Sequence, residues 1–260
     1  MLQKIKAEGG LEGFEYFKGW KLLLVDGVHH FSSQKVQCDT CQAMHHQDGT
    51  ITYNHSMLAS VIAHPDKKEV IPLCEESVIN QDGQTKNDCE LNAVKRLHNK
   101  VKTRHSLDRF IYVEDALFAN GPHIRDIESQ NNRYIIRAKP SSGAGSVFLQ
   151  YEALIDTGQV LKKEASKQKK IFEPYGFHKP SKEPPEINEV STVEKTTIKR
   201  WLFVNGLYLN EANPYIEVNF LRYEERSVSS GKILPFYSMK GIYKAIIFGL
   251  KPEFQKLDSG

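Results

Sequence analysis

Two aspartates that follow short apolar runs are the residues of this sequence best suited to metal chemistry. Asp26 comes after Leu22–Val25, and Asp115 comes after Phe110–Glu114. A carboxylate held where a buried strand reaches solvent is fixed beside open space. On neighbouring strands, two of them would form half of a cage for Mg²⁺ or Mn²⁺, ions that assist phosphoryl transfer on nucleic acids. Asp26 and Asp115 are therefore candidate catalytic and metal-binding residues, although Asp26-Gly27 read alone also fits a simple turn.

The cysteines predict a second, softer kind of metal site. Cys38 and Cys41 form a C-x-x-C pair, whereas Cys74 and Cys89 stand alone. Two thiolates at this spacing are typical of structural zinc. The nearby histidines that could complete a tetrahedron are His45, His46 and His55. Because the sequence contains no second C-x-x-C, a turn that carries two free thiols is the alternative to zinc.

Four further side chains are candidate contacts to DNA. His29 and His30 follow the first aspartate closely, and Lys95 and Arg96 belong to a Lys/Arg-rich stretch that continues to Arg104. Contacts from basic side chains to phosphates supply most of the affinity of sequence-independent DNA binding. The competing explanation is a solvated surface, a polar loop for the histidines and an exposed helix face for Lys95 and Arg96.

Apolar patterns predict the elements that would position these residues. Leu22–Val25 and Phe110–Val113 are typical of strands buried on both faces. Turn signals, including His64–Asp66, separate three closely spaced strands that predict an antiparallel meander: Thr50–Tyr53, Met57–Ala63 and Glu69–Leu73. Thr85–His105 has an apolar stripe at helical spacing, so it can cross over to a parallel strand. Because side chains alternate along a strand, Glu114 should face away from Asp115.

The pattern along the chain predicts an α/β fold in four parts. Residues 1–20 are a lead-in segment, and 21–140 form the core, which ends with a short helix and a strand at Tyr134–Ala138. Residues 141–226 are an insertion: a helix at Val147–Ile155, a flexible Lys/Pro-rich stretch at 158–193, and returning strands at Arg200–Asn205 and Tyr215–Tyr223. Residues 227–260 form a divergent tail without a clean period.

Composition narrows the class of protein without naming it. The chain has 260 residues, 40% hydrophobic residues and a formal net charge of +3, which permits a nucleic-acid partner without demanding one. Sparse cysteines favour a reducing compartment, and neither a signal peptide nor an apolar run near the ~20 residues of a membrane span is present. We expect a cytoplasmic, nucleoid-associated protein with no membrane partner.

Many ordered stretches resemble a group of bacterial insertion-sequence transposases. They are Asp26–Ser33 (D-G-x-x-x-F-S-S), Cys38–Cys41 (C-x-x-C), Tyr53–His55 (Y-x-H), Val70–Glu76 (V-I-P-L-x-x-E), Gln81–Arg96 (Q-D-G-x-x-K-x-D-C-E-x-x-A-x-K-R), Glu114–Ile124, Phe203–Asn213 and Val218–Leu221. The resemblance implies a ribonuclease H-like mixed sheet flanked by helices, with an insertion after the second aspartate. It also implies a DDE-type enzyme in which Asp26 and Asp115 are the two aspartates and Mg²⁺ or Mn²⁺ is the cofactor.

The third acid of that family has no counterpart in this sequence. The family places a glutamate on a later helix, whereas the similarity here ends near Arg226. Glu224 and Glu225 lie in or beside a predicted strand and are poor substitutes, as is Glu253. We therefore expect a fold that is incomplete at the carboxyl end and a truncated copy with little strand cleavage of its own.

Three functions remain open at this stage. The first is a DNA transposase that cleaves and transfers strands, here as a defective truncated copy, with transposon ends, target DNA and further transposase copies as partners. The second is a non-catalytic DNA-binding remnant that interferes with intact transposase. The third is a small zinc-stabilised binding module.

Overall fold

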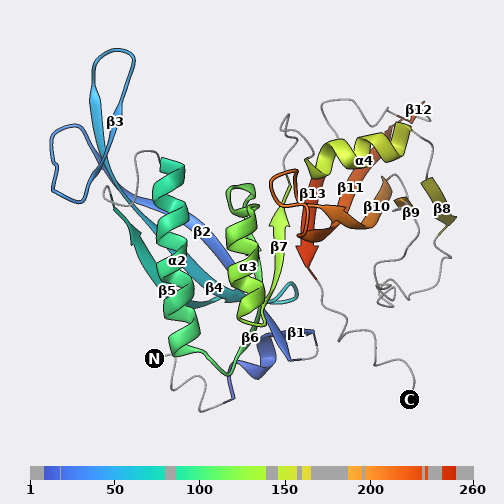
Figure 1. Cartoon of the computed structure of the whole chain (residues 1–260), viewed down its shortest axis with the longest axis horizontal. Helices are drawn as coiled ribbons and strands as arrows, with labels where there is room; N and C mark the ends of the chain where they lie inside the picture. The colour runs from blue at the N-terminus through green and yellow to red at the C-terminus, as the bar shows by residue number, and fades with distance from the viewer. Residues whose placement is uncertain are drawn as a thin grey trace. The chain divides into compact units, whose positions relative to one another are not determined.

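The chain forms two compact units, Met1–Arg133 and Tyr134–Gly260, in a computed structural model (Figure 1). The structure describes residues 9–17, 19–79, 86–138, 146–156, 160–164, 187–194, 197–229, 232–233 and 242–249. No helix among these residues is long and apolar enough to cross a membrane.

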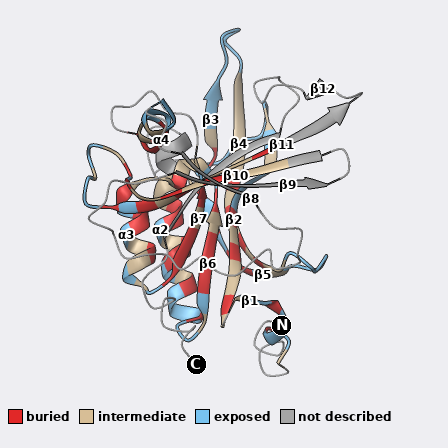
Figure 2. Cartoon of the chain, turned by 90° about the vertical axis from the view of Figure 1, so that its right-hand side faces the viewer, coloured by how far each residue is buried: buried red, intermediate tan, exposed pale blue. Residues whose placement is uncertain are grey.

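The first unit is a mixed sheet with two helices side by side on one of its faces (Figures 1 and 2). Its elements are η1 (Glu12–Phe14), β1 (Glu15–Phe17), β2 (Trp20–Ser33), β3 (Gln42–His45), β4 (Ile51–Ala63), β5 (Ile71–Val78), α2 (Lys86–Arg104), β6 (Arg109–Glu114), η3 (Ala116–Phe118) and α3 (Gly121–Ser129).

The order of the four main strands in this sheet is β5, β4, β2, β6. β2 pairs with β4 and β4 with β5 in antiparallel fashion, so the predicted meander is confirmed. β2 pairs with β6 in parallel, from Trp20↔Arg109 to Leu24↔Val113, and α2 lies in the chain between them. A parallel neighbour requires such a crossover connection. The predicted α/β class with a mixed sheet flanked by helices is therefore confirmed.

The core of the first unit lies where the sheet faces α2 and α3. Figure 2 shows buried residues concentrated there, and Val94, Leu97 and Val101 form the predicted apolar stripe of α2. Each such side chain contributes about 1.5–3 kcal/mol when fully buried. Asn120 directly precedes α3, and its side-chain oxygen accepts a hydrogen bond from the His123 N–H at 3.1 Å and so caps the helix.

Two strands are longer than the sequence predicts. β4 is continuous through Asn54–Ser56, polar residues that suggested a break between two strands. Pairing of β4 with β2, β3 and β5 satisfies its backbone groups, so polar side chains do not end it. β2 likewise continues past Asp26 to Ser33, so Asp26 marks the end of the buried part of the strand and not the end of the strand.

Residues 26–50, which we call the arm, project beyond α2 in Figure 1. The arm contains the outer half of β2, the loop that follows it, β3 and the turn before β4. Within the arm, all of whose residues are described, Cys41 alone is buried. The arm therefore has no hydrophobic core of its own.

The strands of the second unit follow one another in the order β7, β13, β11, β10, β9, β8. Its elements are β7 (Arg133–Arg137), α4 (Val147–Asp156), β8 (Val160–Glu164), β9 (Ile187–Glu194), β10 (Thr197–Tyr208), β11 (Glu217–Ser229), β12 (Lys232–Ile233) and β13 (Ile242–Gly249). Phe148 and Tyr151 of α4 pack on Phe220 of β11, with ring centroids 5.3 and 4.8 Å apart. The predicted helix and the two returning strands are confirmed.

Two predictions for the second half need amendment. The stretch expected to be flexible contains β8 and β9, while residues 165–186 lie outside the described part of the chain. The tail contains β13, an inner strand that pairs with both β7 and β11. Glu253 lies outside the described residues.

Candidate functional site

Asp26 and Asp115 occupy matching positions on adjacent parallel strands. The registered pairing of β2 with β6 ends at Leu24↔Val113, and each aspartate lies two residues further on. Both are exposed. The Gly27 N–H donates to Asp26 Oδ1 at 2.8 Å, and Asp115 has an extended backbone directly before η3. The two carboxylates are thus carried to one end of the sheet and, because paired residues share a face, to the same face.

Glu114 points the other way, as alternation predicts. It is 5% exposed and faces the helix-covered side of the sheet, whereas Asp115 is exposed. Glu90 of α2 is a carboxylate on this side that sequence reasoning gave no role. A β-carbon added to Gly27 would lie 3.6 Å from Glu90 Oε1. The one sequence signal for Glu90 is its place in the D-C-E part of the stretch Gln81–Arg96 that resembles the transposases.

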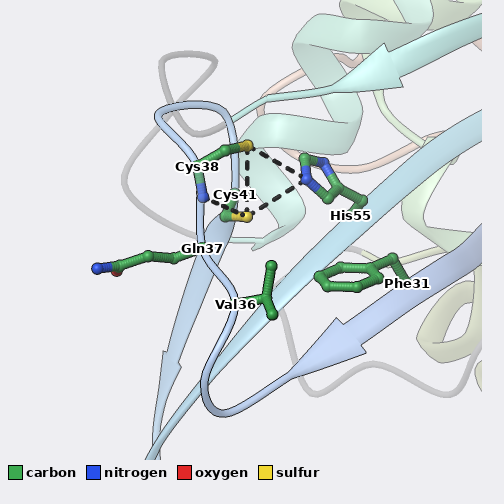
Figure 3. Close-up of a pocket in the computed structure, with 6 residues that line it drawn as sticks. All are labelled: Phe31, Val36, Gln37, Cys38, Cys41 and His55. Carbon is green, nitrogen blue, oxygen red and sulfur yellow. Dashed lines mark hydrogen bonds between the residues drawn. The ribbon is translucent and has the colours of Figure 1, made fainter.

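Among the described residues, two groups have donor atoms that could hold a metal ion, and the first consists of Cys38, Cys41 and His55. The two sulfurs are 3.6 Å apart, and His55 Nε2 is 3.3 Å from each (Figure 3). The cysteines lie in the loop before β3, and His55 lies on β4 opposite Phe31 of β2. A shallow pocket beside the group is lined by Phe31, Val36 and Gln37.

The other predicted zinc ligands lie apart from this group. His46 Nε2 is 2.8 Å from the Thr52 hydroxyl, and His45 is an exposed residue of β3. Of the three candidate histidines, the structure therefore selects His55.

Local hydrogen bonds make Cys38 an acidic thiol. The Thr40 hydroxyl is 3.2 Å from Cys38 Sγ. This hydrogen bond, with the backbone of Thr40 and then Cys41, lowers the pKa of Cys38 to about 6. Burial raises the pKa of Cys41. Both cysteines are free, as is the buried Cys74.

His98, Glu114 and His123 form the second group, which is buried between the sheet and the helices. His123 Nε2 donates to Glu114 Oε2 at 2.6 Å, and His98 Nε2 is 3.5 Å from Glu114 Oε1. The other ring nitrogen of His98 is 3.1 Å from Asp126 Oδ2. Sequence reasoning missed this group, because its members come from α2, β6 and α3 and share no local spacing.

The charges in this buried group support one another. Burial alone would lower the pKa of His98, but hydrogen bonds to Asp126 and Glu114 outweigh it and raise that pKa. Burial alone would raise the pKa of Glu114, but His123 and His98 outweigh it and lower that pKa. The group therefore favours an ionised carboxylate beside protonated imidazole.

The four predicted DNA contacts fall on two separate elements. His29 Nδ1 is 2.8 Å from the Ser56 hydroxyl, and the His30 ring stacks on His55 at a centroid distance of 5.9 Å. Lys95 donates to Asn92 Oδ1 at 2.9 Å, both on α2. Arg96 Nε donates to Glu76 Oε1 at 2.7 Å, so its guanidinium is bound within the protein.

Two acids that could have served as substitute ligands are occupied by ion pairs. Glu76 also pairs with Lys100 at 2.6 Å, and Arg96 and Lys100 lower its pKa although burial opposes them. Glu224 is buried in β11, where it pairs with Arg200 and with Arg222 Nε at 2.7 Å.

Comparison with known proteins identifies no family. No protein-family model matches the chain. No curated protein matches it significantly.

Proposed function

We propose that this chain is a DNA-processing protein of the ribonuclease H-like transposase type. The observation that carries the proposal is the matched placement of Asp26 and Asp115, each two residues beyond the last registered pair of the parallel strands β2 and β6. The meander of β2, β4 and β5, followed by α2 and the parallel strand β6, supports the proposal because it carries the two aspartates on neighbouring parallel strands. The ordered sequence stretches around both aspartates support the same conclusion.

The proposed metal at the aspartates is Mg²⁺ or Mn²⁺. Hard cations prefer carboxylate oxygen, and both side chains are exposed on one face of the sheet. When bound, such an ion polarises a phosphate and helps to deprotonate the attacking water or 3′-hydroxyl. Asp26 and Asp115 would hold the cation and orient the DNA phosphate, and the Asp26 carboxylate is already fixed by the Gly27 N–H. Zinc, a softer ion, is assigned to the thiolates of the arm.

A third carboxylate is needed to complete the proposed site. Glu90 is the candidate that the structure offers, because its carboxylate lies against Gly27, the residue after Asp26. It enters from the helix-covered side of β2, so it would have to reach around the strand to share a cation with the two aspartates. If it does not, the chain binds DNA without cleaving it, and this is the second candidate function.

Metal binding tests the proposal most directly. Mn²⁺ would be titrated into zinc-saturated protein and followed by electron paramagnetic resonance, for wild type, Asp26→Asn, Asp115→Asn and Glu90→Gln. The matched control is Asp66→Asn, an exposed aspartate in the turn after β4. We expect both aspartate variants to lose at least tenfold in Mn²⁺ affinity and the control to match wild type. Unchanged Mn²⁺ binding in both variants would remove the basis of the proposal.

DNA nicking separates the two candidate functions. Supercoiled plasmid would be incubated with each protein in Mg²⁺ and in Mn²⁺, and DNA binding would be measured in parallel. Nicking by wild type that Asp26→Asn abolishes supports the enzyme. Binding that Asp26→Asn leaves intact, with no nicking by any protein, supports the non-catalytic function. Lys95→Ala and Arg96→Ala then report whether α2 contributes to DNA binding.

A further inference from the structure

We propose that Cys38, Cys41 and His55 bind one zinc ion, which fastens the loop of the arm to β4. This metal centre is separate from the aspartate pair, because its donors are thiolates and imidazole, and it does not depend on the proposed DNA function. The ligands come from two segments of the chain, the loop before β3 and the middle of β4. A shared ion would therefore cross-link them.

The spacing of the donor atoms fits a tetrahedral zinc ion. Zinc lies about 2.3 Å from thiolate sulfur and about 2.0–2.1 Å from imidazole nitrogen, so a tetrahedron separates the two sulfurs by ~3.8 Å and each sulfur from the nitrogen by ~3.6 Å. The observed separations are 3.6 Å between the sulfurs and 3.3 Å from each sulfur to His55 Nε2. All three observed separations are therefore close to those of a tetrahedral zinc site, and each is slightly shorter.

The backbone around the cysteines is shaped for thiolates. The Cys41 N–H donates to the Cys38 carbonyl at 3.1 Å, which closes the turn between the two residues. The Cys38 N–H donates to Cys41 Sγ at 3.2 Å. A backbone amide directed at sulfur stabilises the negative charge that a metal ligand requires. Figure 3 shows both sulfurs and the His55 ring converging on one point, while the Gln37 side chain turns away.

The arm also needs a cross-link that its own packing does not provide. Cys41 is its one buried residue, so little apolar surface offsets the ordering of residues 26–50. Ordering a residue costs roughly 1–2 kcal/mol of backbone entropy. Small segments without a core are commonly held by a metal, whose binding free energy stabilises the folded form. Strand pairing of β2 with β4 holds the base of the arm, but the loop at 34–41 lies outside that ladder.

The described part of the chain gives this group three ligands. The fourth position faces the shallow pocket formed with Phe31 and Val36, which is open to solvent. We expect water to complete the tetrahedron. Such a site holds zinc less firmly than four protein ligands would, so protein purified with chelator should lose the ion and take it up again.

Reconstitution with metal tests the proposal in the full chain. Protein stripped with chelator would be titrated with Zn²⁺ and analysed by mass spectrometry for metal content, and Co²⁺ would serve as a spectroscopic substitute. We expect one ion per wild-type chain and a sulfur-to-cobalt charge-transfer band. Cys38→Ser, Cys41→Ser and His55→Ala should each lose the band and the bound ion. His45→Ala and His46→Ala, which change histidines of the same arm outside the group, should keep both.

Proteolysis reports whether the ion fastens the loop. Lys35 is exposed in the loop between β2 and the cysteines, so trypsin can cut after it. We expect Zn²⁺ to slow this cut at least tenfold in wild type and not in His55→Ala, while cuts outside the arm keep their rates.

Two outcomes would overturn the metal site: wild-type protein that takes up no Zn²⁺, or a Cys38→Ser variant that takes up as much Zn²⁺ as wild type. One bound ion with unchanged cleavage at Lys35 would overturn the cross-link. The titration of wild type alone decides whether the chain binds Zn²⁺, so a variant that misfolds does not obscure that result.

Discussion

The exposed group of the arm and the buried group behind the sheet contain the same number of ligand residues but differ in how their donor atoms are spaced. Around His55 the three separations are nearly equal, at 3.3, 3.3 and 3.6 Å. Around Glu114 they are unequal, with 2.6 Å to His123 and 3.5 Å to His98. The short separation is a charge-assisted hydrogen bond with a proton between the atoms, whereas the even separations in the arm lie within about 0.3 Å of those in a tetrahedral zinc site.

Burial explains why the two groups use different cations. Charges taken out of water must be balanced nearby, and the buried group does this with Glu114 and Asp126 against two imidazoles. In the arm, Cys38 is exposed to water, and the loop that carries both cysteines lies outside the ladder of β2 with β4. The comparison therefore predicts that the buried group governs the stability of the first unit and the exposed group governs the order of the arm.

Glu114→Gln should have the largest effect on stability. The substitution removes a fully buried charge and leaves the neighbouring imidazoles without it, which costs about 3–5 kcal/mol when one partner of a buried pair is lost. Urea denaturation of a chain that carries Trp201→Phe, in which Trp20 is the one remaining tryptophan, measures the change by fluorescence. Glu75→Gln on the exposed face of β5 is the control and should stay within about 0.5 kcal/mol of wild type. An equally small change for Glu114→Gln would show that the buried group is not an ion-pair network.

The elements that carry these groups were partly predictable from sequence. The apolar stripe of α2 and the short apolar runs of β2 and β6 are local sequence patterns. Their side chains become the buried faces of these elements, so the pattern predicts the element directly. The buried group was not predictable, because His98 and His123 look like ordinary polar residues of their helices. Only the packing of α2 and α3 on the same face of the sheet brings them to Glu114.

The exposed group was predictable in its cysteines but not in its histidine. C-x-x-C spacing is a local signal, and it pointed to Cys38 and Cys41. The choice of His55 over His45 depends on strand register, which places His55 beside Phe31 and His45 beside Ile51. Register is set by pairing across the sheet, and a misplaced break in β4 hid it. The parallel pairing that aligns Asp26 with Asp115 is also a long-range feature, although the expected crossover helix made it a reasonable prediction.

The pH dependence of stability should follow the buried group. The folded pKa of His98 is raised above its ordinary value of 6.5, so its contribution is complete below pH 6.5 and is lost as pH rises through the folded pKa. The folded pKa of Glu114 is lowered from 4.5, so its contribution is complete above pH 4.5 and is lost as pH falls through the folded value. Stability of the first unit should therefore be greatest between about pH 4.5 and 6.5.

Urea denaturation between pH 4 and 9 measures this profile. Above pH 6.5 we expect a decline of up to about 1.4 kcal/mol per pH unit, the slope that belongs to one proton. His98→Gln should flatten the decline, whereas His64→Gln, which alters a histidine in the exposed turn after β4, should leave it in place. A decline that persists unchanged in His98→Gln would assign the titration to another group.

Cys38→Ser should have the smallest effect on folding, although, like Glu114→Gln, it removes one member of a three-residue group. In metal-free protein the Cys38 side chain is exposed and buries no apolar surface, so we expect no measurable shift of the urea midpoint. Adding Zn²⁺ should raise the urea midpoint of wild type, because an ion that binds only the folded form stabilises it by mass action. The midpoint of Cys38→Ser should not change.

Alkylation by iodoacetamide gives an independent measurement. In the metal-free chain Cys38 should react faster than Cys74, since the pKa of Cys38 is about 6, and Zn²⁺ should protect it. Cys74, whose pKa burial raises, should react slowly with or without the ion and serves as the internal control. If Cys38→Ser instead destabilised the metal-free first unit as strongly as Glu114→Gln, the arm would be part of the folding core and the division between the two groups would fail.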